Sequence, residues 1–398
     1  MIQRVVSPDD FLGKECSMID QIEETASSIS PVGEQPPMPV RRTLKGLVLA
    51  GGKGSRLRPL TATGAKQLVP VANKPVLFYA LEQLVAAGIE EIGIVTGDTA
   101  SQVQEAVGDG SQFGARITYI QQDAPRGLAH AVATGKEFLG NSCFCMYLGD
   151  NFLKEGIEAH AERFTTGTSA GQILLKKLSD VSALGVAVLD EQGRVTRLVE
   201  KPKTPVSDMA VVGVYFFGPE IHEITPTLVP SGRGELEITD AIQGLIDAGY
   251  TVDSAVIDDE WIDTGKKDDM LEANRVVLST IKRRVDGEVD DASHIVGDVV
   301  IEAGAVVIDS TVRGPAIIGA GARIENTFVG PFTAIGDRCQ LICCEIEHSI
   351  VLRDSAIRDI SVRISDSLIG KEVVVEHTEQ KPHALRLLLG DHSQVGIA

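Results

Sequence analysis

The sequence lacks any apolar run long enough to cross a membrane. Its longest apolar runs, such as residues 46–50 and 92–95, are only a few residues long, whereas a membrane-spanning helix needs about 20. The first residues, MIQRVVSPDDFLGKEC, carry aspartates where a secretory signal peptide has its apolar core. We therefore expect a cytoplasmic protein with no membrane partner.

Cysteine is scarce, and no two cysteines form a CxxC pair. The six are at positions 16, 143, 145, 339, 343 and 344, a scattered set that is typical of reduced thiols in a cytoplasm. Cys343, Cys344 and His348 could be interpreted as a metal cluster, but a fourth ligand is missing. We favour the simpler interpretation, in which these cysteines are small buried side chains of a β structure.

Basic residues are outnumbered by acidic ones. The chain has 37 Lys and Arg against 56 Asp and Glu, which gives a net charge of −19. Non-specific binding to DNA or RNA requires a basic surface, so we expect no nucleic-acid partner. A nucleotide ligand is not excluded, because a few cations in one loop can hold its phosphates.

The first two parts of the chain differ in composition and pattern. Residues 1–43 are rich in Ser, Pro and Glu and predict a flexible extension with one short helix near 18–26. Over residues 44–283, strands and helices alternate, which indicates a parallel sheet with helices on both faces. Strands are expected first at 45–50, 91–96, 116–121 and 143–148, and helices at 75–87, 99–107, 127–138, 219–228, 237–248 and 266–283.

The pattern changes after residue 284. An aliphatic residue recurs about every six positions, often followed by Gly, as in Ile318 and Ile324 or Ile335 and Leu341. This spacing is typical of a parallel β-helix, in which each hexad forms one face of a coil. A β-sandwich would require a clearer alternation. We expect hexapeptide-like repeats over residues 284–378 and a C-terminal tail over 379–398.

A glycine-rich loop follows the first strand, in the segment KGLVLAGGKGSRLRPLTATGAKQLVPVANKP. Gly51, Gly52 and Gly54 would let backbone N–H groups approach an anion, and Arg56 and Lys66 would add charge. The loop matches neither the Walker pattern nor GxGxxG. Glycines alone would equally suit a tight strand–helix turn, so the accompanying motifs decide the interpretation.

Those motifs resemble a known family. GGKGSRLRPLT followed by AKQLVPVANKP resembles the sugar nucleotidyltransferase signature, and the second part is similar to that of glucose-1-phosphate thymidylyltransferases. Further matches are GDGSQFG, QQDAPRGLAHAV, LGDN, VEKP, GRGELEITDAI and WIDTG, and the ending LGDHSQVGI resembles the long-form members found in antibiotic-sugar pathways. The resemblance implies an α/β fold: a Rossmann-like nucleotidyltransferase domain with a mixed, mainly parallel sheet, followed by a left-handed parallel β-helix.

The resemblance also implies site residues. They are, for catalysis, Arg56, Lys66, Lys201 and Arg233; for nucleotide binding, Leu49, Gly51, Gly52, Gly54, Ser55, Gln67, Gln122 and Gly127; for the sugar phosphate, Asn151, Gly185, Glu200, Lys201 and Val212; and for Mg²⁺, Asp150 and Asp263. Within the nucleotide set, Gln122 and Gly127 match positions that read the thymine edge. Short-form members have Tyr where this chain has Leu184, so a contact from that tyrosine is absent or replaced. We interpret His130 as structural.

The implied reaction joins dTTP and glucose 1-phosphate into dTDP-glucose and pyrophosphate. Mg²⁺ prefers carboxylate oxygens and retained waters, which suits two aspartates at strand ends. The sugar phosphate is already an anionic nucleophile, so the enzyme must chiefly position it and stabilise charge. The same reaction with UTP or with another sugar phosphate remains an alternative. Thymine differs from uracil by one methyl group, which is worth only about 1–3 kcal/mol in a binding pocket.

The β-helix has two alternative functions. Acyl transfer would need a positioned basic residue and a coenzyme A groove; His294, His348 and His377 are available, but none has a supporting motif. We favour a regulatory or assembly function and expect a homo-oligomer, because stacked coils expose flat faces.

Overall fold

The structure is a computed structural model that describes residues 42–52, 54–61, 64–377 and 392–396. The predicted N-terminal extension lies outside this range up to residue 41, together with its short helix and Cys16. Most of the predicted tail at 379–398 also lies outside it. Within the described residues, no helix is both long and apolar enough to cross a membrane.

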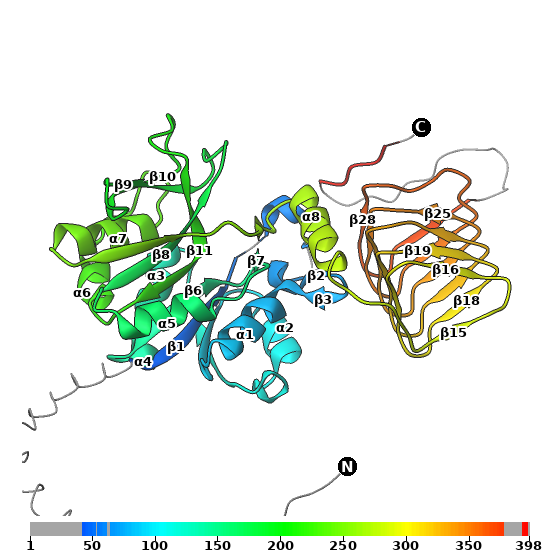
Figure 1. Cartoon of the computed structure of the whole chain (residues 1–398), viewed down its shortest axis with the longest axis horizontal. Helices are drawn as coiled ribbons and strands as arrows, with labels where there is room; N and C mark the ends of the chain where they lie inside the picture. Colours follow the sequence, from blue (N-terminus) through cyan, green and yellow to red (C-terminus); the bar gives the residue numbers. More distant parts are fainter. Residues whose placement is uncertain (1–41, 53, 62–63, 378–391, 397–398) are drawn as a thin grey trace, which may run out of the picture. The chain divides into compact units, whose positions relative to one another are not determined.

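A mixed sheet forms the centre of the first domain (Figure 1). Its main strand order is β10-β9-β11-β6-β1-β4-β5, with β8 pairing β11 and β12. Strands β6, β1, β4 and β5 are parallel, and β11 runs antiparallel to β6, β8 and β9. The bounds are β1 Leu44–Ala50, β4 Glu91–Thr96, β5 Arg116–Gln121, β6 Cys143–Leu148, β8 Gly171–Lys177, β9 Gly185–Leu189, β10 Val195–Glu200, β11 Met209–Phe217 and β12 Val252–Val256. The predicted α/β class is confirmed.

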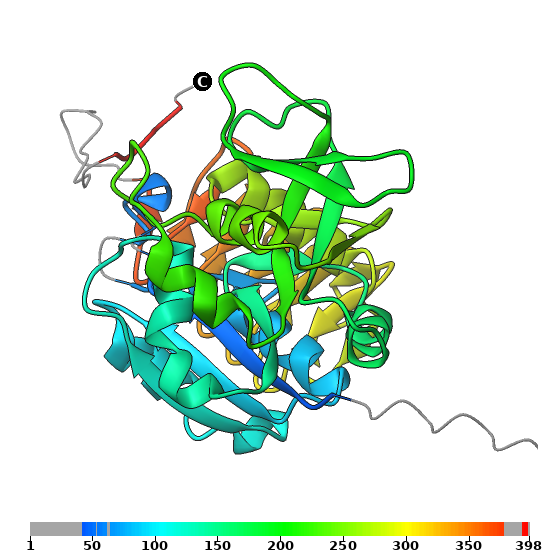
Figure 2. The same ribbon diagram turned by 90° about the vertical axis from the view of Figure 1, so that its left-hand side faces the viewer.

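Helices cover both faces of this sheet (Figures 1 and 2). Alternate residues of β1 belong to two separate cores, Val48 and Ala50 to one and Leu47 and Leu49 to the other, as the two-residue period of a strand requires. The first core contains residues of α1 Val76–Ala86, α2 Ala100–Val107 and α5 Glu158–Thr166; the second contains residues of α3 Leu128–Thr134, α6 Ile221–Ile224 and α7 Ile238–Asp247.

Three predicted helices differ from the observed ones. The helix expected at 127–138 is divided at Gly135 into α3 and α4 Lys136–Leu139. The helix expected at 219–228 continues from α6 into a 3₁₀ turn, η4 Thr225–Thr227, because Pro226 has no N–H for an α-helical hydrogen bond. Helix α8 spans Lys267–Leu278 and is shorter than the predicted 266–283.

Several of the predicted motifs lie in short 3₁₀ turns and two-stranded ribbons outside the main sheet. They are η1 Ser55–Leu57, η2 Lys66–Leu68, η3 Ser111–Phe113, the hairpin β2 Pro70–Val71 and β3 Lys74–Pro75, and a ribbon of β7 Asn151–Leu153 with β13 Trp261–Asp263. In this ribbon Asn151 pairs with Asp263. The LGDN and WIDTG motifs are therefore brought together by backbone pairing.

The C-terminal part is built from three parallel sheets, which confirms the β-helix. Val299 pairs with Ala316 and Ala316 with Thr333, so one coil takes 17 residues. Val307, Ile324 and Leu341 stack in one fully buried inward column. The strands are β14 Arg284–Val285, β15 Glu288–Val289, β16 His294–Val296, β17 Val299–Ile301, β18 Val306–Ile308, β19 Thr311–Arg313, β20 Ala316–Ile318, β21 Arg323–Glu325, β22 Phe328–Val329, β23 Thr333–Ile335, β24 Gln340–Ile342, β25 Glu345–Ile346, β26 Ile350–Val351, β27 Ala356–Arg358, β28 Leu368–Ile369 and β29 Val374–Glu376.

Helix α8 and the β2–β3 hairpin contact the β-helix directly. Asn274 is fully buried; its side chain accepts a hydrogen bond from Ala72 N at 2.9 Å and donates one to Phe332 O at 2.9 Å. Asn73 donates to Ile335 O at 2.7 Å. The domain boundaries expected near residues 44 and 284 stay a prediction.

Candidate functional site

The glycine loop depends on glycine at one position above all. Gly54 has φ +59°, and a Cβ placed on it would lie 2.7 Å from Lys66 Cβ, so any other residue would be strained and would displace the lysine. Gly51 and Gly52 face two of the predicted nucleotide contacts: a Cβ on Gly51 would lie 3.4 Å from Gln122 Oε1, and one on Gly52 would lie 3.4 Å from Gln67 Nε2.

Other predicted nucleotide residues surround the same loop. Leu49 lies in β1 between Val95 and Leu148 and is almost fully buried. Ser55 and Arg56 are exposed on η1. Gln67 is only 2% exposed, and its Oε1 has no hydrogen-bond partner among the residues that the structure describes. A buried polar atom left without a partner is costly, so this oxygen indicates a ligand contact.

A lysine joins the two predicted magnesium aspartates. Lys66 Nζ lies 2.5 Å from Asp150 Oδ2 and 3.6 Å from Asp263 Oδ1. Burial opposes the charge on Lys66, but the two carboxylates outweigh it and raise the lysine pKa. Burial and the nearby charge of Asp150 raise the pKa of Asp263, and Lys66 offsets only part of this rise. The raised pKa of Lys66 favours its charged form, whereas the raised pKa of Asp263 disfavours its charged form; Lys66 lies closer to Asp150 than to Asp263.

This carboxylate pair fits magnesium by its donor chemistry. The described residues contain no group of three or more His, Cys, Asp or Glu side chains placed to hold a metal. Two aspartates nevertheless suit Mg²⁺, which commonly takes one or two carboxylates and completes its shell with waters and substrate phosphates. Thr264, fully buried, holds the backbone of Asp150 through a 2.6 Å hydrogen bond from its hydroxyl to Asp150 O.

The predicted base-reading residues lie beyond the end of β5. Gln122 Nε2 is 2.9 Å from His130 Nδ1. Gly127 has φ +103°, and a Cβ on it would clash with the backbone of Leu236. The backbone of Leu236 donates a hydrogen bond to Arg126 O and accepts one from Ala129 N. The GRGELEITDAI motif therefore contacts the loop that carries the predicted base-reading residues.

A charged cluster gathers the predicted sugar-phosphate residues. Glu200 Oε1 is 3.1 Å from the Arg233 guanidinium and 3.6 Å from Lys201 Nζ, and its Oε2 accepts a 3.3 Å hydrogen bond from Thr239. Arg233 also pairs with the buried Glu237 at 2.8 Å. Gly185 pairs with Glu200 across the β9–β10 hairpin. Two cations and an acceptor could thus hold a phosphate and a hydroxyl together.

Two of the residues predicted to bind the sugar phosphate, Asn151 and Val212, do not present a free side chain to a ligand. Asn151 donates to Asp150 Oδ1 at 3.2 Å and accepts from Trp261 Nε1 at 2.7 Å, so its side chain orients the aspartate. Val212 is fully buried, but the pairing of β11 with β8 is irregular between Val211 and Tyr215, which leaves its backbone as the group that could meet a ligand.

Sequence reasoning missed four of these residues: Trp261, Thr264, Thr239 and Glu237. Trp261 and Thr264 lie inside the WIDTG motif, and the others lie inside GRGELEITDAI. The motifs were therefore the available signal. Leu184, which stands where short-form members have Tyr, packs against the same apolar cluster as Trp261, and its carbonyl oxygen accepts a 3.0 Å hydrogen bond from Lys201 N.

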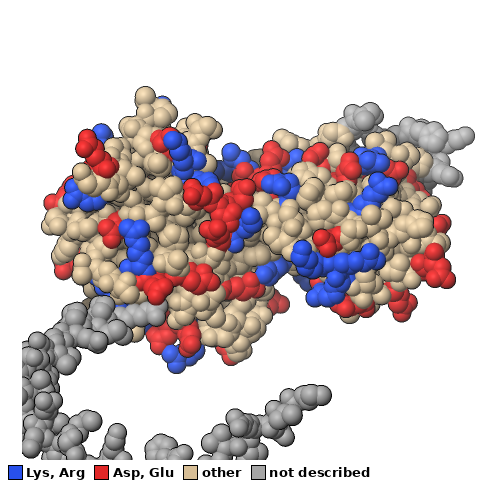
Figure 3. All heavy atoms as spheres, viewed as in Figure 1, with Lys and Arg blue, Asp and Glu red and all other residues tan. Residues whose placement is uncertain are grey.

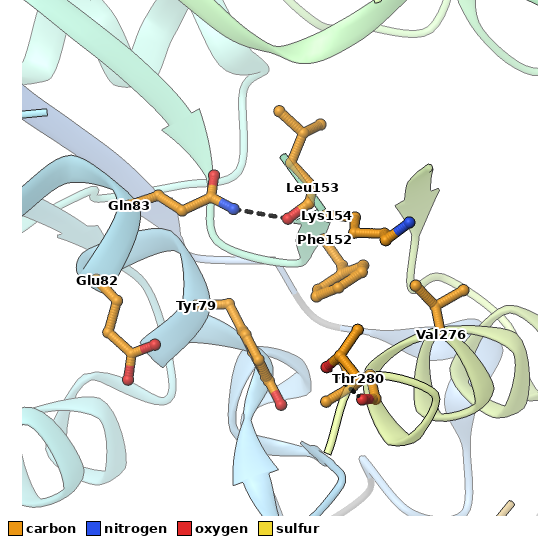
Figure 4. A pocket seen from close by; sticks show the side chains of 9 residues that line it. Tyr79, Glu82, Gln83, Phe152, Leu153, Lys154, Val276 and Thr280 are labelled. Atoms are coloured by element: carbon orange, nitrogen blue, oxygen red, sulfur yellow. Dashed lines mark hydrogen bonds between the residues drawn. The ribbon is translucent and has the colours of Figure 1, made fainter. Parts of the chain in front are cut away.

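A separate hollow lies between α1, β7 and α8 (Figure 4). It encloses ≈ 200 Å³ and is lined by Tyr79, Glu82, Gln83, Phe152, Leu153, Lys154, Val276, Val277 and Thr280. Gln83 donates to Leu153 O at 2.6 Å across it. It includes none of the predicted site residues. On the face shown in Figure 3, acidic and basic side chains are interspersed.

Comparisons with known proteins agree with this geometry. The nucleotidyl transferase family model matches residues 45–280. Glucose-1-phosphate thymidylyltransferases from Streptomyces antibioticus and Streptomyces griseus are 54% and 52% identical, each over 89% of this chain and over 99% and 100% of their own length. A Bacillus anthracis structure described as a glucose-1-phosphate thymidylyltransferase is 34% identical, with a TM-score of 0.56 over 59% of this chain and 95% of its own. The chain belongs to the nucleotidyl transferase family, and within it to the glucose-1-phosphate thymidylyltransferases.

Proposed function

We propose that this nucleotidyl transferase converts dTTP and glucose 1-phosphate into dTDP-glucose and pyrophosphate with Mg²⁺. The observation that carries the proposal is the Lys66–Asp150–Asp263 cluster, which lies at the strand ends beside the glycine loop. The curated relatives named above supply the substrate pair.

The reaction requires no protein nucleophile. An oxygen of the sugar phosphate attacks the α-phosphorus of dTTP in line, the bond from that phosphorus to the bridging oxygen breaks, and pyrophosphate leaves with the electron pair. Arg56 and Lys66 would stabilise charge on the triphosphate and leaving group, while Lys201 and Arg233 would orient the sugar phosphate. Asp150 and Asp263 would hold Mg²⁺, which neutralises phosphate charge when bound.

The test is a pyrophosphate-release screen of the purified protein over several nucleoside triphosphates and hexose 1-phosphates, with and without Mg²⁺. We expect the highest kcat/KM for dTTP with glucose 1-phosphate, measurable use of UTP because uracil differs from thymine by one methyl group, and loss of turnover in EDTA. A clear preference for a purine triphosphate would contradict the proposal. We also propose a homo-oligomer, which light scattering would test.

A further inference from the structure

His130 is hydrogen-bonded to the glutamine predicted to read the base. Gln122 Nε2 lies 2.9 Å from His130 Nδ1 and 3.5 Å from Gly127 O. Its Oε1 faces Gly51 of the glycine loop. The amide is thus held at its nitrogen end and presents its oxygen toward the predicted nucleotide site.

Asp123 lies near the other ring nitrogen of His130 and favours a hydrogen there. His130 Nε2 lies 3.6 Å from Asp123 Oδ1, and Asp123 is itself paired with Arg126. A carboxylate favours a hydrogen on the nitrogen that faces it. Neutral His130 therefore carries Nε2–H and has a bare Nδ1, which can only accept a hydrogen bond. Gln122 must then turn its NH₂ group toward His130.

This arrangement determines what Gln122 offers a base. With its NH₂ group engaged, the amide presents an acceptor, which suits the N3–H donor of thymine or uracil and not the N3 acceptor of cytosine. We propose that His130 is a positioning residue for base selection, which fixes the Gln122 amide so that the site takes imide bases and rejects cytosine. The inference rests on the proposed function, because it assumes a pyrimidine nucleotide whose base faces Gln122.

Paired substitutions at His130 test the proposal. His130→Ala removes the acceptor, whereas His130→Asn keeps an acceptor oxygen close to the place of Nδ1. Pyrophosphate release is measured with dTTP and with dCTP at saturating glucose 1-phosphate. We expect His130→Ala to raise the KM for dTTP about 10-fold and to change kcat less than about 3-fold. A contact with the base is equally strong in the ground state and in the transition state, so its loss weakens binding and leaves the chemical step nearly unchanged. The dTTP-over-dCTP ratio of kcat/KM falls about 10-fold, and His130→Asn restores it.

Three further variants separate positioning from a structural effect. In a Gln122→Ala background, adding His130→Ala leaves the base ratio unchanged, because no amide remains to be oriented. Asp123→Ala, at an exposed side chain, lowers the ratio in the same direction as His130→Ala, and it decides the question if His130→Ala does not fold. His160→Ala on α5 is the matched control, since only the backbone of His160 accepts the hydrogen bond from Gln172.

Two outcomes overturn the positioning function: an unchanged base ratio in folded His130→Ala or Asp123→Ala, or an equal loss of the ratio with and without Gln122. A wild-type protein that prefers purine triphosphates would instead overturn the proposed function itself, so the two failures are distinguishable.

Discussion

Lys66 Nζ lies 2.5 Å from Asp150 Oδ2, although the two residues come from different elements, η2 and the loop after β6. The contact places an ammonium where the family resemblance expects both a metal and a triphosphate. A cation that neutralises the carboxylates without a ligand can turn to the phosphates when substrate and Mg²⁺ arrive. We therefore expect substitutions in this cluster to affect kcat and to affect the stability of the ligand-free protein by different amounts.

Asp150→Asn and Asp263→Asn should each lower kcat at least about 10²-fold, because a metal ligand supplies several kcal/mol of charge stabilisation. Their effects on stability should differ. Asp263 is a half-buried carboxylate beside another one, with a raised pKa, so the neutral amide should not lower the melting temperature at pH 7 without Mg²⁺. Asp150→Asn weakens the close pair with Lys66 and should lower the melting temperature. Steady-state kinetics measures kcat, and calorimetry measures the melting temperature. If either variant kept near-wild-type turnover at saturating Mg²⁺, the substituted aspartate would not be a metal ligand.

Lys66→Met and Arg56→Ala should each lower kcat and kcat/KM together by about 10²–10³-fold, because their charges act mainly on the transition state. Lys66→Met should also bind Mn²⁺ more tightly without nucleotide, since no ammonium then competes for Asp150 and Asp263. Arg56 is exposed, and its charge is the smallest of the influences on the pKa of Asp263, so Arg56→Ala should change that affinity much less and serves as the control. If only the KM for glucose 1-phosphate rose, these cations would belong to the sugar site.

Much of the fold was predictable from local pattern. Strands β1, β4, β5 and β6 match the expected ranges within one residue, because β1, β4 and β6 are short, mainly apolar runs and β5 mixes polar with β-branched and aromatic residues. The β-helix followed from its six-residue spacing. The helix ends were less accurate: a proline and a glycine interrupted two helices, and α8 stops at Leu278, before the predicted end.

The candidate site was predictable only as a set of motifs. No local periodicity indicates that Asn151 pairs with Asp263 in a ribbon, or that Lys66 reaches both aspartates. These contacts join segments far apart in the chain and depend on the completed sheet. The same limit applies to His130, which we interpret as structural from the sequence, since its hydrogen bond joins helix α3 to Gln122, just after β5.

Glu302 should make the β-helix less stable as the pH rises. Burial and the neighbouring charge of Asp337 raise the pKa of Glu302, and both carboxylates accept a hydrogen bond from Ala320 N. A raised folded-state pKa means that the native state binds the proton more tightly. The contribution of Glu302 is therefore complete below its unfolded pKa and is lost as the pH rises through the folded pKa. Glu302→Gln should gain melting temperature relative to wild type between about pH 5 and pH 7. A difference that is constant with pH would refute this origin.

The last prediction concerns the contact between the catalytic domain and the β-helix. One apolar cluster contains Leu57, which follows Arg56, and Ile262, which precedes Asp263, together with Ile350 and Leu352 of the β-helix. We expect a chain truncated at residue 285 to lose activity as well as solubility, because the apolar support behind the predicted catalytic Arg56 and the predicted magnesium ligand Asp263 would be exposed to water.

Asn274→Ala tests the same coupling without truncation. It leaves Ala72 N and Phe332 O without their buried partner, which costs about 1–3 kcal/mol for each group, and it loosens the hairpin that follows Lys66. We expect a lower melting temperature and a kcat reduced several-fold at a temperature where the variant is fully folded. Thr280→Ala is the control, because among the described residues this hydroxyl donates only to Val277 O, in the last turn of α8, and reaches neither the hairpin nor the β-helix. If Asn274→Ala lost stability but kept its full kcat, the β-helix contact would support the fold without positioning the catalytic groups.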